Sequence, residues 1–193
     1  ALIHEGIGDV VYDPTGTFEV GETVVMIPNR PVEQDDIIAE NYLRSSKFCA
    51  SSMDGFLQEY VQAVPDRFVH LPKGINPTVA AYTELVSVSF HAVNRFLRFS
   101  HERRDVIGVW GDGNLGYITS LLLKKMLPDS RIYIFGVTEN KLSDFTFADA
   151  IYCVNDIPED LWIDHAFECV GGAAASKAIN QIIDCLLYTS PSP

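Results

Sequence analysis

Three glycines near the middle of the chain have a spacing that could hold a phosphate. In the stretch "VIGVWGDGNLGYITSLLLKK", residues 106–125, they follow the pattern G-x-G-x-x-G between an apolar run and leucines at helical spacing. The first permits a tight turn after a strand, the second lets backbone approach a pyrophosphate, and the third lets a helix pack closely on the strand. The helix start then holds the phosphate through its N–H groups and dipole, although a purely structural glycine turn is the alternative. The residues assigned to dinucleotide binding are Gly111, Gly113, Asn114, Leu115 and Gly116.

The segment "RIYIFGVTENKL" bears on the kind of dinucleotide. A carboxylate at the end of the second strand of such a fold binds the adenosine ribose 2′-hydroxyl of NAD. Gly136 stands at that position, and Thr138 and Lys141 offer a hydroxyl and an ammonium group suited to a 2′-phosphate. We therefore expect NADPH to be preferred, and an aspartate at position 136 to erode the preference. Lys141 as an ordinary surface lysine is the alternative, with Glu139 then the ribose ligand.

The N-terminal stretch "LIHEGIG" could contribute to a metal site. Neutral imidazole and carboxylate groups are both zinc ligands, and His4 and Glu5 stand next to each other before a Gly-x-Gly turn. Adjacent residues of a strand point to opposite faces, so both can bind one ion only where the backbone bends. A structural role for His4 is the alternative.

Composition and charge exclude several classes of function. A formal net charge of −12 argues against a surface for nucleic acid or anionic membranes, which requires clustered Lys and Arg. No apolar run approaches the roughly 18 residues of a membrane span. Cys49, Cys153, Cys169 and Cys185 form no C-x-x-C pair, so we expect free thiols in a reducing cytoplasm.

The hydrophobic pattern changes along the chain. Short strands are expected within residues 7–27 and in "GFLQEYVQAV" and "RFVHLP", around an irregular surface excursion at 28–54. Residues 78–99 have helical spacing. Expected strands at 106–110, 131–135, 150–154 and 166–170 then alternate with expected helices at 115–127, 141–145 and 173–186. This alternation predicts an α/β unit with a parallel sheet.

Several motifs together resemble a known family. "HEGIG", "GTFEVGETVVMIPN" and the later glycine turn resemble the zinc-dependent medium-chain alcohol and polyol dehydrogenases. "IAENYLRSSKF", "DGFLQEYV", "YTELVSVSFHA", "WGDGNLGYITSLLL" and "DHAFECVGG" narrow the resemblance to ribulose-5-phosphate reductases of CDP-ribitol and teichoic-acid synthesis. The resemblance implies a partial GroES-like β-rich catalytic domain at 1–77, followed by the first part of a Rossmann parallel sheet at 78–186. Residues 187–193 form a tail that resembles neither domain.

The resemblance also implies the site and its chemistry. Zinc would be bound by His4 and Glu84, with Glu5 as a ligand or a neighbouring carboxylate, and NADPH would reduce ribulose 5-phosphate to ribitol 5-phosphate. Arg44 and Lys47 are candidates for the substrate phosphate, although a solvated basic turn is the alternative. A homodimer and a cytidylyltransferase partner are implied by the same family. A dehydrogenase of another polyol or secondary alcohol, and a zinc-free dinucleotide-binding module, are the rival interpretations.

Parts of the family pattern are missing from residues 1–193. The family's zinc cysteine and proton-relay hydroxyl would lie upstream of residue 1, and strands that complete the Rossmann sheet would follow residue 186. We therefore expect this chain to be a fragment. The 193-residue chain alone should not oxidise NADPH with ribulose 5-phosphate in a spectrophotometric assay, and measurable turnover would contradict the expectation.

Overall fold

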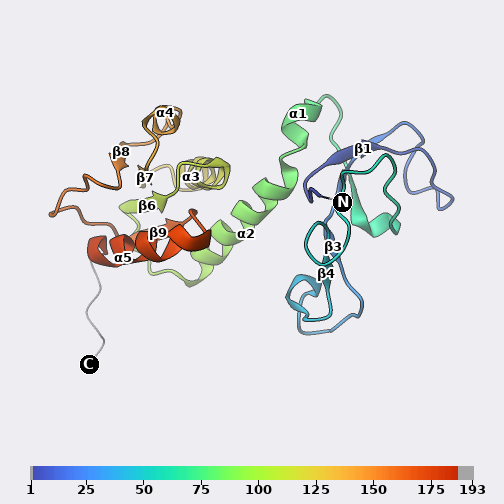
Figure 1. Ribbon diagram of the computed structural model, residues 1–193, viewed down its shortest axis with the longest axis horizontal. Coiled ribbons are helices and arrows are strands. Elements are labelled where there is room, and N and C mark those ends of the chain that lie inside the picture. Colours follow the sequence, from blue (N-terminus) through green and yellow to red (C-terminus); the bar gives the residue numbers. More distant parts are fainter. Residues whose placement is uncertain (1, 187–193) are drawn as a thin grey trace. The chain divides into compact units, whose positions relative to one another are not determined.

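The computed structural model describes residues 2–186, and the chain divides into two compact units, Ala1–Leu85 and Val86–Pro193 (Figure 1). Each unit has its own hydrophobic clusters. The domain boundary expected at residue 78 from the sequence stays a prediction, and the expected tail at 187–193 lies outside the described residues.

Short antiparallel strands form the framework of the first unit. Its three-stranded sheet has the order β1-β2-β5, with β1 at Ile7–Asp9, β2 at Thr23–Met26 and β5 at Phe68–His70. A second pair joins β3 (Asn29–Arg30) to β4 (Lys47–Phe48), and two 3-10 helices lie at Glu40–Tyr42 (η1) and Pro65–Arg67 (η2). The segment "GFLQEYVQAV" was expected to be a strand and is not one. Phe56 and Leu57 donate their N–H groups to the carbonyls of Ile3 and Leu2, and the Gln58 N–H donates to the Phe56 carbonyl in a local turn.

A buried arginine holds the excursion at 28–54 to the rest of this unit. Arg67 is 7% exposed, and its guanidinium donates to both carboxylate oxygens of Glu40, at 2.6 and 3.2 Å. It also donates to Asp66 and to the Asn29 carbonyl. A bidentate arginine–carboxylate pair fixes orientation as well as distance. The excursion is thereby anchored on η2.

The helix expected over 78–99 is divided in two. The first part, α1 at Pro77–Ala80, begins after Asn76, whose side chain accepts from the Thr78 N–H. The second part, α2, runs over Thr83–Phe99. Between them the Thr83 hydroxyl donates to the Ala80 carbonyl at 2.6 Å, which satisfies an acceptor that a continuous helix would give to an N–H group. Periodicity did not reveal this break because both parts keep apolar residues at helical spacing.

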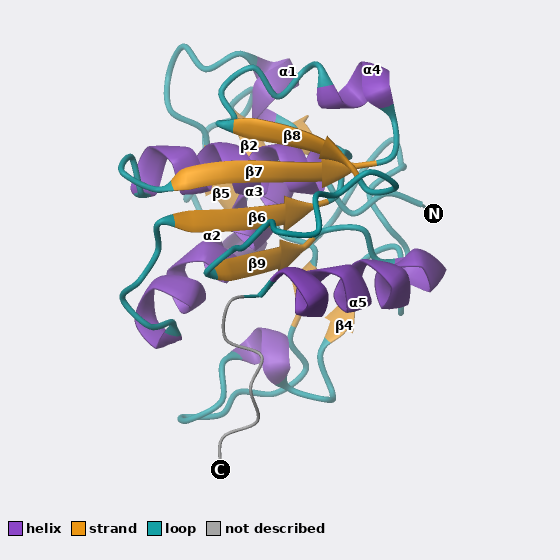
Figure 2. Ribbon diagram, turned by 90° about the vertical axis from the view of Figure 1, so that its left-hand side faces the viewer, coloured by secondary structure: helices purple, strands orange, loops and turns teal. Residues whose placement is uncertain are grey.

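A parallel sheet of order β8-β7-β6-β9 forms the second unit, as Figure 2 shows, and confirms the expected α/β fold. Its strands are β6 (Val106–Trp110), β7 (Arg131–Gly136), β8 (Ala150–Cys153) and β9 (His165–Glu168). The helices are α3 (Asn114–Met126), α4 (Glu139–Leu142) and α5 (Ala175–Cys185), the last preceded by the 3-10 turn η3 (Gly172–Ala174). Thus α4 lies two to three residues before its expected position, and the other elements lie within a few residues of theirs.

Strand alternation distributes side chains to two cores, one on each face of the sheet. Ile107 and Val109 of β6 pack in one cluster with residues of α2 and α3, including Val93 and Leu123. Trp110 and Phe135 of β6 and β7 pack in the other with residues of α5. Their rings stack at 3.7 Å between centroids. Because successive side chains of a strand point to opposite faces, the continuous apolar run at 106–110 supplies both cores.

The turn between β6 and α3 requires its glycines. A Cβ atom on Gly116 would lie 2.0 Å from the Gly111 carbonyl oxygen. Gly111 itself has φ of +132°, and a Cβ there would lie 2.8 Å from the Cys169 carbonyl oxygen. Gly113 has open space around its Cβ position and an extended backbone, with φ −94° and ψ −176°. The first and third glycines therefore serve packing, and the second leaves the turn open.

We predict that Gly116→Ala destabilises the second unit by about 2 kcal/mol or more, because backbone must shift to admit the methyl group. Gly113→Ala is the matched control and should change the free energy of unfolding by less than about 1 kcal/mol. Urea unfolding followed by tryptophan fluorescence measures both. Equal effects of the two substitutions would show that the close approach of Gly116 to the Gly111 carbonyl does not determine the stability of the second unit.

Candidate functional site

Three predicted metal ligands lie together in the first unit. One ligand atom from each of His4, Glu5 and Glu84 falls within 4.8 Å of the others. His4 Nε2 is 3.9 Å from Glu5 Oε1 and 3.9 Å from Glu84 Oε2. The Glu84 side chain is only 12% exposed, whereas those of His4 and Glu5 are 43% and 34% exposed. One imidazole nitrogen and two carboxylates form a donor set that suits zinc.

The chain bends at His4, outside any strand, so His4 and Glu5 need not point to opposite faces. Ile3 has φ of +67°, a left-handed conformation that is uncommon for a β-branched residue. Its carbonyl accepts from the Phe56 N–H at 2.6 Å, and the Gly6 carbonyl accepts from the Met26 N–H at 3.1 Å. The segment is thus held on both sides of the bend. His4 is also packed edge-on against Phe48, with ring centroids 5.2 Å apart.

Glu84 reaches the cluster from the first turn of α2. Desolvation raises the pKa of this carboxyl group, and the Glu5 carboxylate raises it further, whereas His4 acts in the opposite direction. Two acidic groups near one imidazole and partly removed from water are costly to keep ionised without a cation. The cluster therefore has both the donor atoms and the negative charge that a divalent cation would balance.

The predicted substrate residues lie on the excursion in the same unit. Arg44 and Lys47 are exposed, and neither forms an ion pair within residues 2–186. Lys47 precedes Phe48, the residue that packs on His4. The neighbouring hydroxyl groups are already engaged, because Ser45 donates to Glu33 and Ser46 to the Glu40 carbonyl. Among the four described side chains of residues 44–47, Arg44 and Lys47 therefore remain available to a phosphate.

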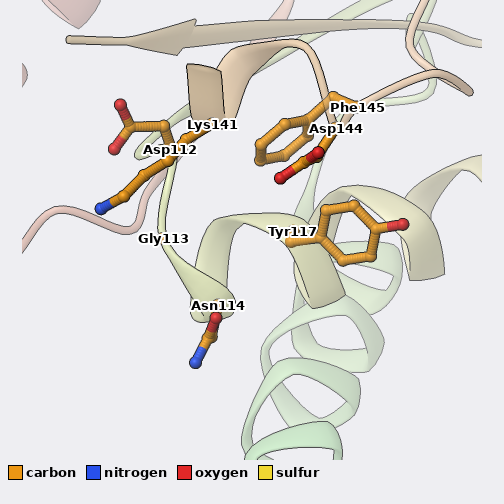
Figure 3. A pocket seen from close by; sticks show the side chains of 7 residues that line it. All are labelled: Asp112, Gly113, Asn114, Tyr117, Lys141, Asp144 and Phe145. Atoms are coloured by element: carbon orange, nitrogen blue, oxygen red, sulfur yellow. The ribbon is translucent and has the colours of Figure 1, made fainter. Parts of the chain in front are cut away.

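A cavity of about 470 Å³ opens at the glycine turn of the second unit (Figure 3). Of the predicted cofactor residues, Gly113, Asn114 and Lys141 line it. Gly111 and Gly116 are buried and shape the turn behind it, and Leu115 is half-buried. Gly113 precedes α3 without a side-chain cap, so the first-turn N–H groups stay available to a phosphate.

Four further residues line this cavity and were not identified from the sequence: Asp112, Tyr117, Asp144 and Phe145. Helical spacing could have found Tyr117, which lies three residues after Asn114 on α3. Asp112 is the acidic residue within the glycine motif itself, and this position was the feature of the sequence that could have identified it as a cavity residue. Asp144 and Phe145 follow α4 and reach the cavity only because the chain folds back there.

The structure changes the explanation for Gly136. A Cβ there would lie 2.7 Å from Asp112 Cβ and 2.8 Å from Leu142 Cδ2. The space that was interpreted as room for a 2′-phosphate is therefore filled by the Asp112 side chain. An aspartate at position 136 would displace this side chain, so it is no clean test of cofactor choice. Thr138 precedes α4, and its N–H donates to Asp112 Oδ2 at 2.7 Å.

Comparison with known proteins gives close relatives. The chain is 62% identical over 183 residues to a ribulose-5-phosphate reductase of Bacillus spizizenii, covering 95% of this chain and 54% of that protein. It is 54% identical over 191 residues to ribulose-5-phosphate reductase 1 of Staphylococcus aureus, covering 99% and 55%. The crystal structure of S. aureus TarJ in complex with NADPH matches with a TM-score of 0.79 and 47% identity, over 96% of this chain and 52% of that one.

Over nearly its whole length the chain is therefore similar to ribulose-5-phosphate reductases and to the TarJ structure. It spans about half the length of the curated relatives that it matches. No family model matches it. All four cysteines are free thiols in the structure. Among residues 2–186, no helix is both long and apolar enough to cross a membrane.

Proposed function

We propose that this chain is part of an enzyme that reduces ribulose 5-phosphate to ribitol 5-phosphate with NADPH. The observation that carries the proposal is the convergence of His4, Glu5 and Glu84 in a chain that also has an open glycine turn. A metal-ligand cluster and a dinucleotide cavity together are what a zinc-dependent reductase requires. The names of the relatives support the substrate, and the NADPH complex of TarJ supports the cofactor.

His4 and Glu84 would hold the zinc ion, and Glu5 would complete the set or orient it. Bound zinc supplies Lewis acidity that polarises the C2 carbonyl of the ketose. Phe48 fixes the imidazole through its edge-on contact, and the burial of Glu84 keeps water from its carboxylate. These residues would thereby orient the carbonyl toward hydride transfer. A bound cation would offset the desolvation and, to a lesser extent, the Glu5 repulsion that raise the pKa of Glu84.

The glycine turn would hold the pyrophosphate of NADPH at the start of α3. Lys141, which lines the same cavity, would pair with the 2′-phosphate. The Thr138 hydroxyl, the other predicted donor, hydrogen-bonds to Asp112 and would have to leave it to reach the phosphate. Arg44 and Lys47 would bind the phosphate of the sugar. A homodimer, a cytidylyltransferase partner and a cytoplasmic location, all implied by resemblance, stay predictions.

The rival proposals differ in zinc and in substrate. A zinc-free dinucleotide-binding module would need no cluster of one imidazole and two carboxylates, and this cluster favours the zinc enzyme. A dehydrogenase of another polyol would keep both sites and differ in the groups that meet the substrate phosphate. Loss of turnover with ribulose 5-phosphate, but not with an unphosphorylated ketose, on Arg44→Ala or Lys47→Ala would favour the phosphorylated substrate.

We predict that His4→Ala and Glu84→Ala, made in the complete enzyme, each reduce bound zinc well below one equivalent. The turnover number should fall by more than about 100-fold, since changes to residues that only orient metal ligands already cost 10- to 100-fold. Metal analysis by mass spectrometry and steady-state kinetics measure both, and circular dichroism checks the fold.

His70→Ala is the matched control for these substitutions. His70 is also a histidine beside a carboxylate in the first unit, but it pairs with Glu22 alone. Zinc content and turnover should be retained in this variant. If Glu84→Ala kept stoichiometric zinc and near-normal turnover, the assignment of Glu84 would be wrong. If the unmodified enzyme bound no zinc, the zinc site would be ruled out and the zinc-free dinucleotide-binding module would be favoured.

We predict that the complete enzyme prefers NADPH over NADH by at least tenfold in kcat/KM, and that Lys141→Ala removes much of the preference. A charge-assisted contact with a phosphate contributes about 1.5–3 kcal/mol, less where solvent screens it. NADPH should therefore weaken by roughly tenfold while NADH changes little. Lys125→Ala, an exposed lysine of α3 outside the cavity lining, is the control. Equal use of both cofactors by the unmodified enzyme contradicts this assignment.

A further inference from the structure

Asp112 holds two N–H groups of the segment that follows β7. Its Oδ2 accepts from the Val137 N–H at 2.9 Å and from the Thr138 N–H at 2.7 Å. One carboxylate oxygen thus joins the glycine turn to the segment after β7. This contact fixes the position of the carboxylate within the cavity that Gly113 and Lys141 also line (Figure 3).

The Asp112 carboxyl group occupies the place of a missing side chain. The Cβ position of Gly136 lies 2.7 Å from Asp112 Cβ and 3.0 Å from its Cγ. In dinucleotide-binding folds the side chain at the end of the second strand is the carboxylate that binds the ribose. Here a carboxylate is present at the end of β7, but it belongs to Asp112, in the turn after β6.

The charge state of Asp112 suits a hydrogen-bond acceptor. Partial burial acts to raise its pKa, but hydrogen bonds from the Thr138 and Val137 N–H groups, from the Thr138 hydroxyl and from its own N–H together outweigh this effect, so the pKa is held below its usual value. The group is ionised at neutral pH. Oδ2 accepts from two N–H groups and the Thr138 hydroxyl also donates to the carboxylate, but a carboxylate has about four acceptor sites, so Oδ1 can accept a further hydrogen bond from a ligand in the cavity.

We propose that Asp112 is the ribose-binding residue of this site, accepting a hydrogen bond from the adenosine 3′-hydroxyl through Oδ1. The proposal rests on the proposed function, since it takes the cofactor to be NADPH. In NADPH the 2′-oxygen carries the phosphate, so the 3′-hydroxyl is the donor that remains on this ribose. Lys141 of α4 supplies a positive charge for the 2′-phosphate, and Asp112 accepts the hydrogen bond of the neighbouring 3′-hydroxyl.

The test uses adenosine 2′,5′-bisphosphate and its 3′-deoxy analogue as probes. Isothermal titration calorimetry gives their dissociation constants for the protein, for Asp112→Asn and for Asp112→Ala. Hydrogen bonds to charged groups imply that the unmodified protein binds the 3′-hydroxyl form roughly tenfold more tightly or better. Both variants should lower this ratio to about threefold or less. Asp112→Asn keeps an acceptor for the Val137 and Thr138 N–H groups, so it tests the contact without releasing the loop.

Asp144→Asn is the control for loss of charge. Asp144 lines the same cavity, so its substitution removes a negative charge there, and it should leave the ratio between the two probes unchanged. A protein that binds both probes equally, or an Asp112→Asn variant with the full ratio, overturns the role of Asp112. Failure of the unmodified protein to bind adenosine 2′,5′-bisphosphate at all counts instead against NADPH as the cofactor.

Discussion

The close approach of Gly116 to the Gly111 carbonyl is the contact on which the second unit depends. It brings the start of α3 onto the end of β6, where a Cβ would lie 2.0 Å from that oxygen. The Gly111 N–H donates to Phe135 of β7, and the Cys169 N–H after β9 donates to Trp110 of β6. Three strand ends are therefore joined at one turn. The cavity lies there because ligands of open α/β sheets bind beyond the carboxyl ends of the strands.

The metal-ligand cluster of the first unit depends on a different constraint. Regular strand geometry would separate His4 from Glu5, but the chain bends at His4, directly after Ile3 with its left-handed backbone. A left-handed conformation at such a residue costs on the order of 1–2 kcal/mol. The hydrogen bond from Phe56 to the Ile3 carbonyl offsets part of this cost. Strain of this kind is often located at functional sites, and here it coincides with three groups that could bind one cation.

The relation between Asp112 and Gly136 shows why cofactor choice is difficult to interpret from one position. Absence of an acid at the end of β7 indicated a site free of negative charge, yet the structure brings a carboxylate to that end from another turn. What a 2′-phosphate meets is then the sum of Asp112 and Lys141, which are 29 positions apart in the sequence. The segment after β7 contains Lys141 but not Asp112, so inspection of that segment alone reveals only one of the two charges.

The sequence alone determined the α/β class, the strand order along the chain and the glycine turn, because each depends on periodicity or on backbone freedom within a few residues. It also pointed to His4, Glu5 and Glu84, although the last came from resemblance and not from spacing. Only the tertiary structure decided that these three meet, since the segment that carries His4 and Glu5 is held by hydrogen bonds from Phe56 and Met26, far along the chain. The break before α2, in contrast, is closed by a local bond from Thr83 to Ala80. The same holds for Asp112: its type is visible in the sequence, but the place of its carboxylate depends on the packing of one turn against another strand.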